Sequence, residues 1–207
     1  FQLPPTADLF SDGFETYPNF TLTFAPWTLV DVDQSATYGI QGYTWENAYS
    51  PMAFIIFNPS ATTPALTSLT PHGGSKMACS FASTTPPNND WMITPQFTGA
   101  NSIKFWARSY VADYGLERFK VGVSTTTNPN NFTIISGPTY IQAPVDWTEY
   151  TYQITQPGPL YIGIQCVSND AFFFCVDDVL VTGGDVNDLE VPVVATALHN
   201  NYPNPFN

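Results

Sequence analysis

The sequence predicts an all-β protein, a jelly-roll β-sandwich of two antiparallel sheets with an extended C-terminal arm. Apolar and polar residues alternate over short runs, clusters of Pro, Gly and Asn separate these runs, and helical periodicity is nearly absent. Such alternation is typical of antiparallel strands that bury one face. Many short strands joined by long polar connections favour two stacked sheets.

The alternating runs predict six strands in chain order. They are Lys76–Phe81, Ser102–Tyr110, Arg118–Ser124, Thr148–Ile154, Leu160–Val167 and Phe172–Val181. Between strands lie loops such as Asn58–Gly74, Ser83–Asp90 and Thr125–Asn131, whose Asn-Pro or Pro-Pro steps cannot continue a central strand. No repeat with a period of about 20 to 50 residues is visible, which excludes a solenoid.

The composition changes after Val181 and divides the chain into two parts. Residues 1–183 are expected to form one jelly-roll domain, because a single sandwich can occupy a chain of this size. Residues 184–207 comprise an acidic linker, the β-prone segment Val191–Leu198 and the terminal segment Asn200–Asn207.

The charge balance excludes two classes of partner. The chain has 17 acidic residues, 5 basic residues and a formal net charge of −12. Five basic residues cannot neutralise a row of phosphates, so nucleic acid is excluded as a main partner. The negative charge argues against anionic lipid, and the longest apolar run, Met52–Phe57, is too short to cross a bilayer.

Several segments together resemble the cleaved-adhesin or choice-of-anchor J family, whose domains are MAM-like jelly rolls of bacterial surface proteins. The segments are Phe14-Glu15, Asn89–Pro95, Ile103–Ser109, Phe119–Thr126, Phe132–Pro138, Trp147–Tyr150, Tyr161–Gln165 and Val176–Val179. They occur in the family's order over nearly the whole predicted domain. The terminal run Leu198–Asn207 resembles the beginning of a C-terminal sorting domain of type IX secretion. This resemblance implies export to the cell surface or the medium.

The resemblance also implies a structural calcium ion that ties the terminal strands together. The matching positions are Glu15 and Asp177. Asp177 has the strand parity of Val179, so we expect it to point to the core, where a carboxylate needs a metal or a cation partner. Asp12 could add an oxygen ligand, and Asp178 alternates to the other side; alternatively, these acids only cap turns.

A second acidic segment, Asp31-Val32-Asp33, is a weaker calcium candidate. In the family this region often carries more Asp and Gly, whereas here Gln34 and Ser35 follow. An exposed acidic turn is the competing interpretation.

The three cysteines allow one disulfide to be predicted. Cys166 and Cys175 flank the turn-forming residues Ser168–Asp170, so a disulfide is possible if their strands form a hairpin. Export would permit it. Cys79 is predicted to be a buried, inert thiol, and three unpaired thiols remain an alternative. With two His and no C-x-x-C pair, a zinc site is not expected.

Four of the five basic residues lie between positions 104 and 120. If Phe105 pairs with Phe119 in a hairpin, one side of the sheet presents a positive, aromatic patch. Its members are Lys104, Trp106, Arg108, Tyr110, Arg118 and Lys120. Such a patch suits a carboxylate, an acidic glycan or an acidic segment of another subunit. The competing interpretation is a solvated outer face.

Catalysis has little support, because neither a G-x-S-x-G elbow nor a phosphate-binding Gly loop occurs and no pair of acids stands out. We therefore expect a non-enzymatic, secreted or cell-surface adhesin-like module for protein interaction or self-assembly. One alternative is a carbohydrate-binding module, with Tyr43, Trp45, Trp106 and Tyr110 as stacking residues. A polysaccharide hydrolase is a further alternative.

The C-terminal arm suggests a route to self-assembly. Glu190–Leu198 is β-prone and lacks a local partner strand. Such a segment can add to an open sheet edge of a neighbouring molecule, which gives a filament if the rotation does not close. A return along the same subunit is the alternative.

Overall fold

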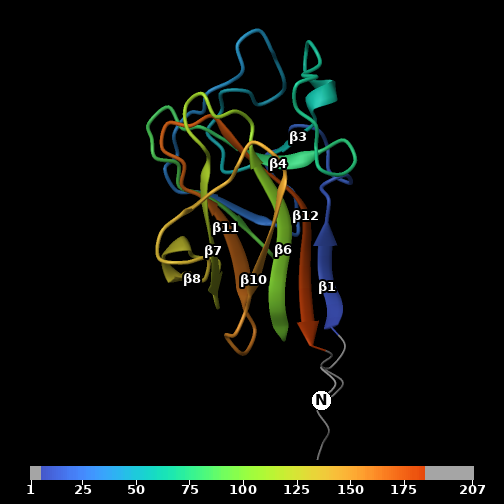
Figure 1. Ribbon diagram of the computed structural model, residues 1–207, viewed down its shortest axis with the longest axis vertical. Helices are drawn as coiled ribbons and strands as arrows, with labels where there is room; N and C mark the ends of the chain where they lie inside the picture. The colour runs from blue at the N-terminus through green and yellow to red at the C-terminus, as the bar shows by residue number, and fades with distance from the viewer. Residues whose placement is uncertain (1–5, 185–207) are drawn as a thin grey trace, which may run out of the picture.

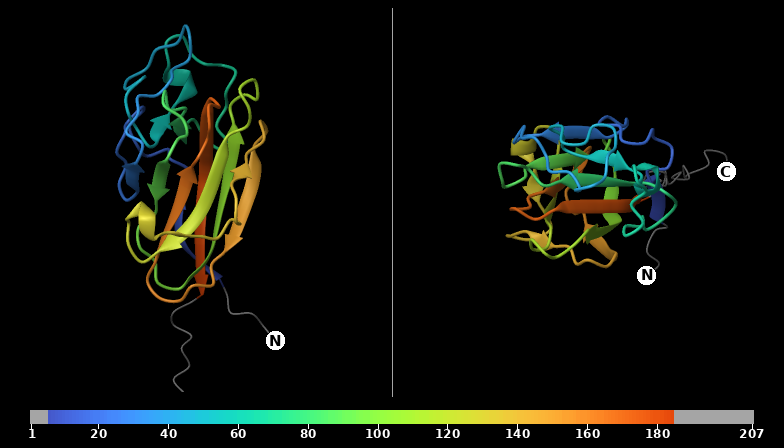
Figure 2. Two further views of the ribbon diagram at one scale, coloured as in Figure 1. Left: turned by 90° about the vertical axis from the view of Figure 1, so that its left-hand side faces the viewer. Right: turned by 90° about the horizontal axis from the view of Figure 1, so that it is seen from above.

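The computed structural model describes residues 6–184, in which two six-stranded antiparallel sheets form a sandwich (Figures 1 and 2). Sheet A has the order β10-β6-β12-β4-β3, and β1 also pairs with β12. Sheet B has the order β2-β5-β11-β7-β8, and β9 also pairs with β7. The predicted all-β sandwich is therefore confirmed.

The strand bounds are β1 (Thr6–Asp12), β2 (Thr28–Asp31), β3 (Ile55–Phe57), β4 (Met77–Phe81), β5 (Asp90–Ile93), β6 (Ala100–Ser109), β7 (Arg118–Ser124), β8 (Thr133–Ile134), β9 (Ile141–Gln142), β10 (Thr148–Gln153), β11 (Tyr161–Cys166) and β12 (Phe173–Gly184). Two short 3₁₀ turns, Pro59–Ala61 and Pro129–Asn131, interrupt the loops. Within residues 6–184, no helix is long and apolar enough to span a bilayer.

The main core lies between the sheets and follows from strand alternation. In β6, Ile103, Phe105 and Ala107 are fully buried, while the residues between them are half-buried on the other side. The rings of Phe105 and Phe119 meet edge to face with centroids 5.7 Å apart. Because these rings belong to β6 and β7, their contact joins the two sheets.

A second apolar cluster lies on the outer side of sheet A, where β3, β4 and the start of β12 are covered by loops at one end of the sandwich (Figure 1, top). Phe81 and Phe173 stack with centroids 4.5 Å apart, and Trp45 packs edge-on against Phe57. This end of sheet A is consequently buried on both faces.

The central strand β12 contributes to the main core along its whole length, but the parity of its core-facing residues changes partway: Phe174 and Val176 face the core before the change. Phe173 and Cys175 belong to the second cluster, whereas Val179 and Val181 belong to the main core. The register with β6 shifts between Asp177 and Leu180, and Asp178 has a φ of 48°. A bulge of this kind inserts residues into one strand and re-aims its side chains.

Two sequence predictions about strand pairing are wrong. The hairpin that pairs Phe105 with Phe119 does not exist, because β6 lies in sheet A and β7 in sheet B. The hairpin of Cys166 and Cys175 fails for the same reason, since β11 and β12 belong to different sheets. All three cysteines are buried free thiols, and Cys175 is opposite Cys79 instead. The predicted disulfide of Cys166 with Cys175 is therefore excluded.

Both ends of the described chain lie at the same end of the sandwich, where Thr6 pairs with Gly184 (Figure 1). The predicted linker, the arm and the sorting segment, residues 185–207, lie outside the described residues.

Candidate functional site

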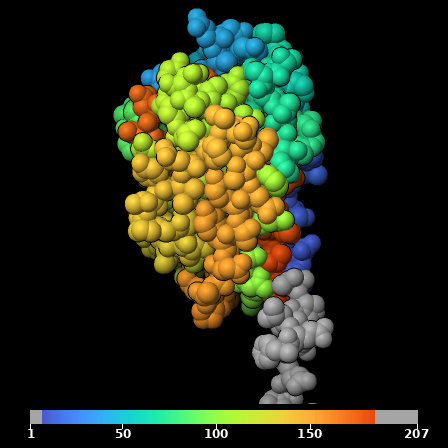
Figure 3. Space-filling model, in the orientation of Figure 1, coloured from blue at the N-terminus to red at the C-terminus, as the bar shows by residue number. Residues whose placement is uncertain are grey.

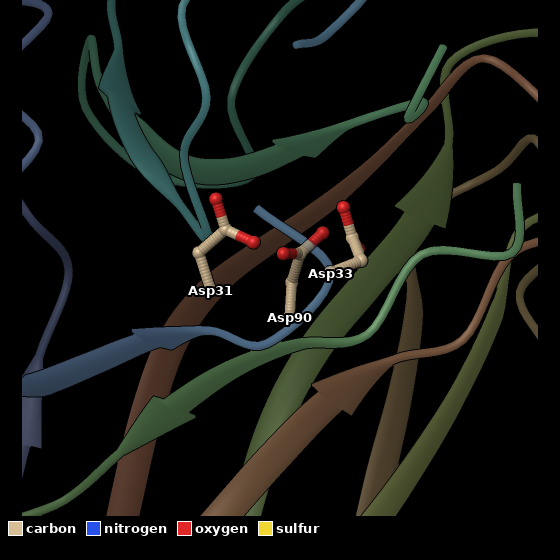
Figure 4. Close-up of side chains that lie close together, drawn as sticks. All are labelled: Asp31, Asp33 and Asp90. Carbon is tan, nitrogen blue, oxygen red and sulfur yellow. The ribbon is translucent and has the colours of Figure 1, made fainter. Parts of the chain in front are cut away.

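Three aspartates form an acidic cluster on sheet B, and we call them the Asp triad. Asp31 ends β2, Asp90 begins β5, and the two are direct partners in the antiparallel register. Asp33 lies in the turn after β2. One carboxylate oxygen from each residue lies within 4.8 Å of the others. Figure 4 shows Asp90 between Asp31 and Asp33, with all three carboxylates on the same side of the ribbon.

Backbone donors hold the two outer carboxylates in place. Asp31 Oδ1 accepts a 2.6 Å hydrogen bond from the Gln34 amide. Asp33 accepts from the Ser35 amide at 3.0 Å and from the Asn89 amide at 2.7 Å. The turn therefore orients both carboxylates toward Asp90 before any ligand arrives.

Asp90 is the buried member of the triad, with 1% of its surface exposed. Its Oδ2 accepts from Ser80 Oγ at 2.9 Å and from Asn88 Nδ2 at 2.8 Å. Its Oδ1 is buried and has no hydrogen-bond partner among residues 6–184. Burial, together with the charges of Asp33 and Asp31, raises the pKa of Asp90 to about 8.

No basic side chain neutralises the triad within the described part of the chain, where the ion pairs are His72–Asp178 and Lys104–Glu149. Carboxylates directly opposite each other across two strands repel, and an unpaired buried oxygen costs about 1–3 kcal/mol. Either a proton on Asp90 or a hard cation relieves this arrangement. Three carboxylates, with backbone carbonyls and water, are the ligand type that Ca²⁺ prefers.

The sequence indicated only part of this triad. It marks Asp31 and Asp33 as the weaker calcium candidate and carries no signal for Asp90, which lies in the Asn89–Pro95 segment. The pairing of β2 with β5, which places Asp90 opposite Asp31, is not visible in either strand alone.

The four residues predicted to bind calcium lie around one corner of sheet A, and we call them the corner acids. Asp177 is fully buried, and its Oδ2 accepts from the amides of His72 and Gly73 at 2.9 and 3.1 Å. Burial raises its pKa to about 7. Asp177 shares the face of Cys175 by regular alternation, and the bulge that follows turns Val179 to the opposite face, so the expectation that Asp177 shares the face of Val179 is wrong.

The other corner acids are also occupied by protein donors. Asp12 Oδ2 accepts from Tyr17 Oη at 2.6 Å and from Trp27 Nε1 at 2.7 Å. Glu15 Oε1 accepts from the amides of Ser75 and Lys76 at 2.8 and 2.7 Å. Hydrogen bonds keep the pKa of Glu15 below its usual value although burial opposes this.

Asp178 lies beside two loops, with 40% of its side chain exposed. Its Oδ2 lies 2.5 Å from His72 Nδ1. A Cβ on Gly13 would lie 3.0 Å from Asp178 Oδ1, and one on Gly73 would lie 2.9 Å from Oδ2. A side chain at either position would therefore have to displace the Asp178 carboxylate. Among residues 6–184, the Asp triad is the group of three acidic side chains whose oxygens lie close enough together to share one metal ion.

The predicted six-residue basic patch is split between the two outer faces of the sandwich. Lys104, Trp106 and Arg108 lie on the outer side of β6 in sheet A. Arg118 and Lys120 lie on the outer side of β7 in sheet B, where the Arg118 guanidinium lies 4.5 Å from the centre of the Tyr140 ring. The six side chains of the predicted patch therefore cannot bind one ligand together.

The sheet A part of the patch gains two aromatic residues that the sequence did not indicate. His72 stacks on Trp106 with centroids 3.9 Å apart, and its edge meets Trp147 at 5.9 Å. The Arg108 guanidinium lies 5.8 Å from the Trp147 ring. We call Lys104, Trp106, Arg108, His72 and Trp147 the sheet A face.

Loops and strands far apart in the sequence build this face. Trp147 Nε1 donates to the Thr70 carbonyl at 3.0 Å, which fixes the loop of His72 beside the segment of Trp147 (Figure 3, teal and orange). Lys104 Nζ lies 3.3 Å from Glu149. A hollow of about 340 Å³ opens beside Lys104 and Trp106, between Gly13 and Asp178.

The other aromatic residues predicted to stack on sugars serve the second cluster. Trp45 packs on Phe57 and Phe81, with centroids 5.4 Å away in each case. Tyr110 stacks on Phe173 at 4.5 Å, and Tyr43 packs against the same cluster. These three rings are therefore engaged in packing rather than displayed for a ligand.

Comparison with known proteins identifies the fold. No protein-family model and no curated protein matches the chain. The K2 cleaved adhesin domain of Lys-gingipain is similar over 84% of this chain and 99% of its own, with a TM-score of 0.64 and 21% identity. The K1 domain of Lys-gingipain from Porphyromonas gingivalis W83 is similar over 87% and 99%, with a TM-score of 0.59 and 18% identity.

A xylan-binding domain shares the same architecture. The CBM22-1 domain of Xyn10C from Paenibacillus barcinonensis is similar over 88% of this chain and 98% of its own, with a TM-score of 0.50 and 12% identity. The chain therefore has a cleaved-adhesin-like sandwich fold, which carbohydrate-binding domains also use.

The pH dependence of unfolding in EDTA tests the state of Asp90. Its pKa is about 4 in an unfolded chain and about 8 in the fold, so the folded state binds more protons between these values. The stability from this group is therefore complete below about pH 4 and is lost as the pH rises to about 8. We expect the melting temperature to fall between about pH 5 and pH 8.5.

The variant Asp90→Asn should remove much of this fall, because an amide does not ionise. A smaller fall should remain, because burial also raises the pKa of Glu117 and of Asp177 to about 7. Asp8→Asn, on an exposed position of β1, is the control and should behave as the unmodified chain does. The same fall in Asp90→Asn and in the control would contradict the buried, proton-binding state.

Proposed function

We propose that this chain is a non-enzymatic, exported adhesin-like module that binds an acidic protein segment through the sheet A face. The observation that carries this proposal is that Lys104 and Arg108 lie beside three aromatic rings on one face of a chain with a net charge of −12. Lys104 is paired with Glu149, so an acidic partner would replace that carboxylate. Similarity to cleaved adhesin domains supports the same class of function. The terminal segment that resembles a type IX sorting signal supports a location at the cell surface or in the medium.

The chemistry of the sheet A face favours a protein partner. Aromatic residues and Arg are enriched where interfaces are most strongly bound, and Arg with Lys selects carboxylates. Lys104 and Arg108 are half-buried, so part of their desolvation cost is already met in the free protein. A second copy of this chain offers many acidic groups, so self-association through this face is the interaction we expect.

We also propose that calcium is the structural cofactor and that the Asp triad holds it. The Oδ1 of Asp90, which has no hydrogen-bond partner among residues 6–184, is the observation that fits a cation there. Bound calcium would be coordinated by oxygens of all three aspartates, and it would tie the turn after β2 to the beginning of β5. The corner acids, which the sequence favoured, have their oxygens turned toward amide and side-chain donors.

Thermal unfolding with added calcium tests this placement. A ligand at about 100 times its Kd stabilises the fold by about 2.7 kcal/mol, which raises the melting temperature of a domain of this size by roughly 5–10 °C. We expect this shift in the unmodified chain and in Glu15→Gln, and its loss in Asp90→Asn. A shift that survives in Asp90→Asn and disappears in Glu15→Gln would move the ion to the corner. No shift in the unmodified chain would refute the cofactor.

Sedimentation of the full chain at low and high salt tests the sheet A face. We expect concentration-dependent association that weakens between about 20 mM and about 300 mM NaCl, because salt screens exposed charges. The double variant Lys104→Glu/Arg108→Glu should weaken it by about tenfold or more. The matched control is Arg118→Glu/Lys120→Glu, which makes the same change of charge on the outer face of sheet B and should have little effect.

A chain that ends at Gly184 separates this route from strand addition by the arm. Equal effects of the two double variants would contradict the sheet A face. If only truncation abolishes association, the arm carries it and forms the contact that leads to a filament.

A second candidate function, glycan binding, is favoured by one hollow at the loop end of the sandwich. The hollow has a volume of about 410 Å³, within the range of small-ligand sites. Two exposed rings line it, Tyr38 at 46% and Tyr114 at 66% exposure, above Phe172. Gln41 and Asp170 add polar groups at the same hollow. Aromatic rings can stack on the apolar face of a sugar while amide and carboxylate groups bind its hydroxyls.

Calorimetric titration with a panel of neutral oligosaccharides, including xylo-oligosaccharides, tests the second candidate. We expect Tyr38→Ala and Tyr114→Ala each to weaken binding by about tenfold, since loss of an aromatic contact costs about 1 kcal/mol or more. Tyr140→Ala, at another exposed tyrosine, which packs on Arg118, is the control. Binding that is unchanged in both variants would exclude the hollow, and a panel without any binding would exclude the function.

A further inference from the structure

Two of the three buried thiols are direct neighbours across two strands. Cys79 in β4 and Cys175 in β12 are partners in the antiparallel register. Their Sγ atoms lie 3.3 Å apart, and both residues are fully buried in the second cluster. From this arrangement we infer that Cys79 and Cys175 form a disulfide when the chain folds in an oxidising medium, which would join the middle of sheet A covalently.

The backbone already has the geometry that such a bond requires. Residues directly opposite each other in an antiparallel pair have Cα atoms about 4.5 to 5.5 Å apart. Disulfides span Cα separations of about 4.4 to 6.8 Å. Because the two sulfurs are in contact, a rotation of the side chains closes the bond without moving either strand.

The third cysteine provides an internal contrast. Cys166 belongs to sheet B, and its Sγ lies 3.4 Å from Ser168 Oγ. Its partner across β7 is Phe119, so neither of the other thiols faces it within its own sheet. Pairing should therefore be selective for Cys79 and Cys175, although the chain holds an odd number of cysteines.

The oxidant must be an external disulfide, such as oxidised glutathione or an oxidoreductase of the same chemistry. The thiolate of one cysteine attacks this disulfide and releases one reduced thiol, which leaves a mixed disulfide on the protein. The thiolate of the other cysteine then displaces the second external thiol. The protein loses two protons and two electrons, and the external disulfide takes them up and is reduced to two thiols.

Because both thiols are buried in the folded protein, this reaction can occur only during folding. A mixed disulfide with glutathione does not fit where both sulfurs are fully enclosed by Phe81, Phe173 and the covering loops. Burial and the neighbouring Cys175 also raise the pKa of Cys79, so the folded thiol forms little thiolate. The bond must therefore form before sheet A closes, and once formed it is protected from reductants.

The bond would close a long loop. The two cysteines are 96 positions apart, so their connection removes much freedom from the unfolded chain. It would link β4 to β12, the strand that also pairs with β6 and β1. The bond would thereby stabilise the second cluster together with the strands of sheet A that pair with β12.

Refolding of the full chain in a glutathione redox buffer tests the inference. After reduction, denaturation and refolding, we expect an intact mass lower by two hydrogen atoms and a peptide that links Cys79 with Cys175. Cys166 should remain free and react with an alkylating agent after unfolding. The melting temperature of the oxidised protein should exceed that of the reduced protein by roughly 5–15 °C.

Two controls make the outcome decisive. Cys166→Ser should still lose two hydrogen atoms, whereas Cys79→Ser and Cys175→Ser should not. Reduced protein that is folded before it meets the same buffer should stay reduced for hours. The inference is overturned if the unmodified chain refolds in this buffer with both Cys79 and Cys175 open to alkylation, or with a bond to Cys166. Neither result bears on the proposed binding function.

Discussion

The change of facing in β12 at Asp177 and Asp178 is the constraint on which the rest of this structure depends. Before it, Cys175 faces the second cluster and β12 pairs with β4; after it, Val179 faces the main core and β12 pairs with β1. A regular strand would keep one parity throughout and would turn Val179 and Val181 to the face of Cys175, away from the main core. The buried carboxylate of Asp177 then holds the loop of His72 against sheet A, which places His72 over Trp106.

Three buried carboxyl groups show how their surroundings decide their roles. Asp177 accepts backbone amides at both oxygens, so its polar capacity is satisfied by the fold. Glu117 has one oxygen bonded to the Phe172 amide and the other without a partner among residues 6–184. Asp90 also has an unpartnered oxygen, but Asp31 and Asp33 surround it. A proton suffices for Glu117, whereas three converging acids favour a divalent cation because it neutralises several charges at once.

The two proposed binding surfaces use different parts of the sandwich. The sheet A face is built on strands β6 and β10 and held by hydrogen bonds from the loop of His72, so its side chains are oriented by a rigid frame. The hollow lined by Tyr38 and Tyr114 lies among loops, where the Tyr49 ring packs closely against Gly39, the neighbour of Tyr38. A rigid charged face suits a protein partner, and an aromatic hollow suits a small neutral ligand.

Alternation of residues along the chain determined the fold class and the six main strands, because the faces of a strand are a local property of period two; the change of parity within β12 was not visible in it. The partners of those strands were decided only by the tertiary structure. Phe105 and Phe119 meet whether β6 and β7 are neighbours or face each other across the core, so the sequence pattern is the same for both arrangements. For the same reason, the sequence did not show that Cys175 and Arg108 lie in a different sheet from Cys166 and Arg118. It also did not show that Asp90 lies opposite Asp31 or that His72 stacks on Trp106. Each of these contacts joins segments far apart in the chain, and their pairing depends on packing energies that no single segment contains.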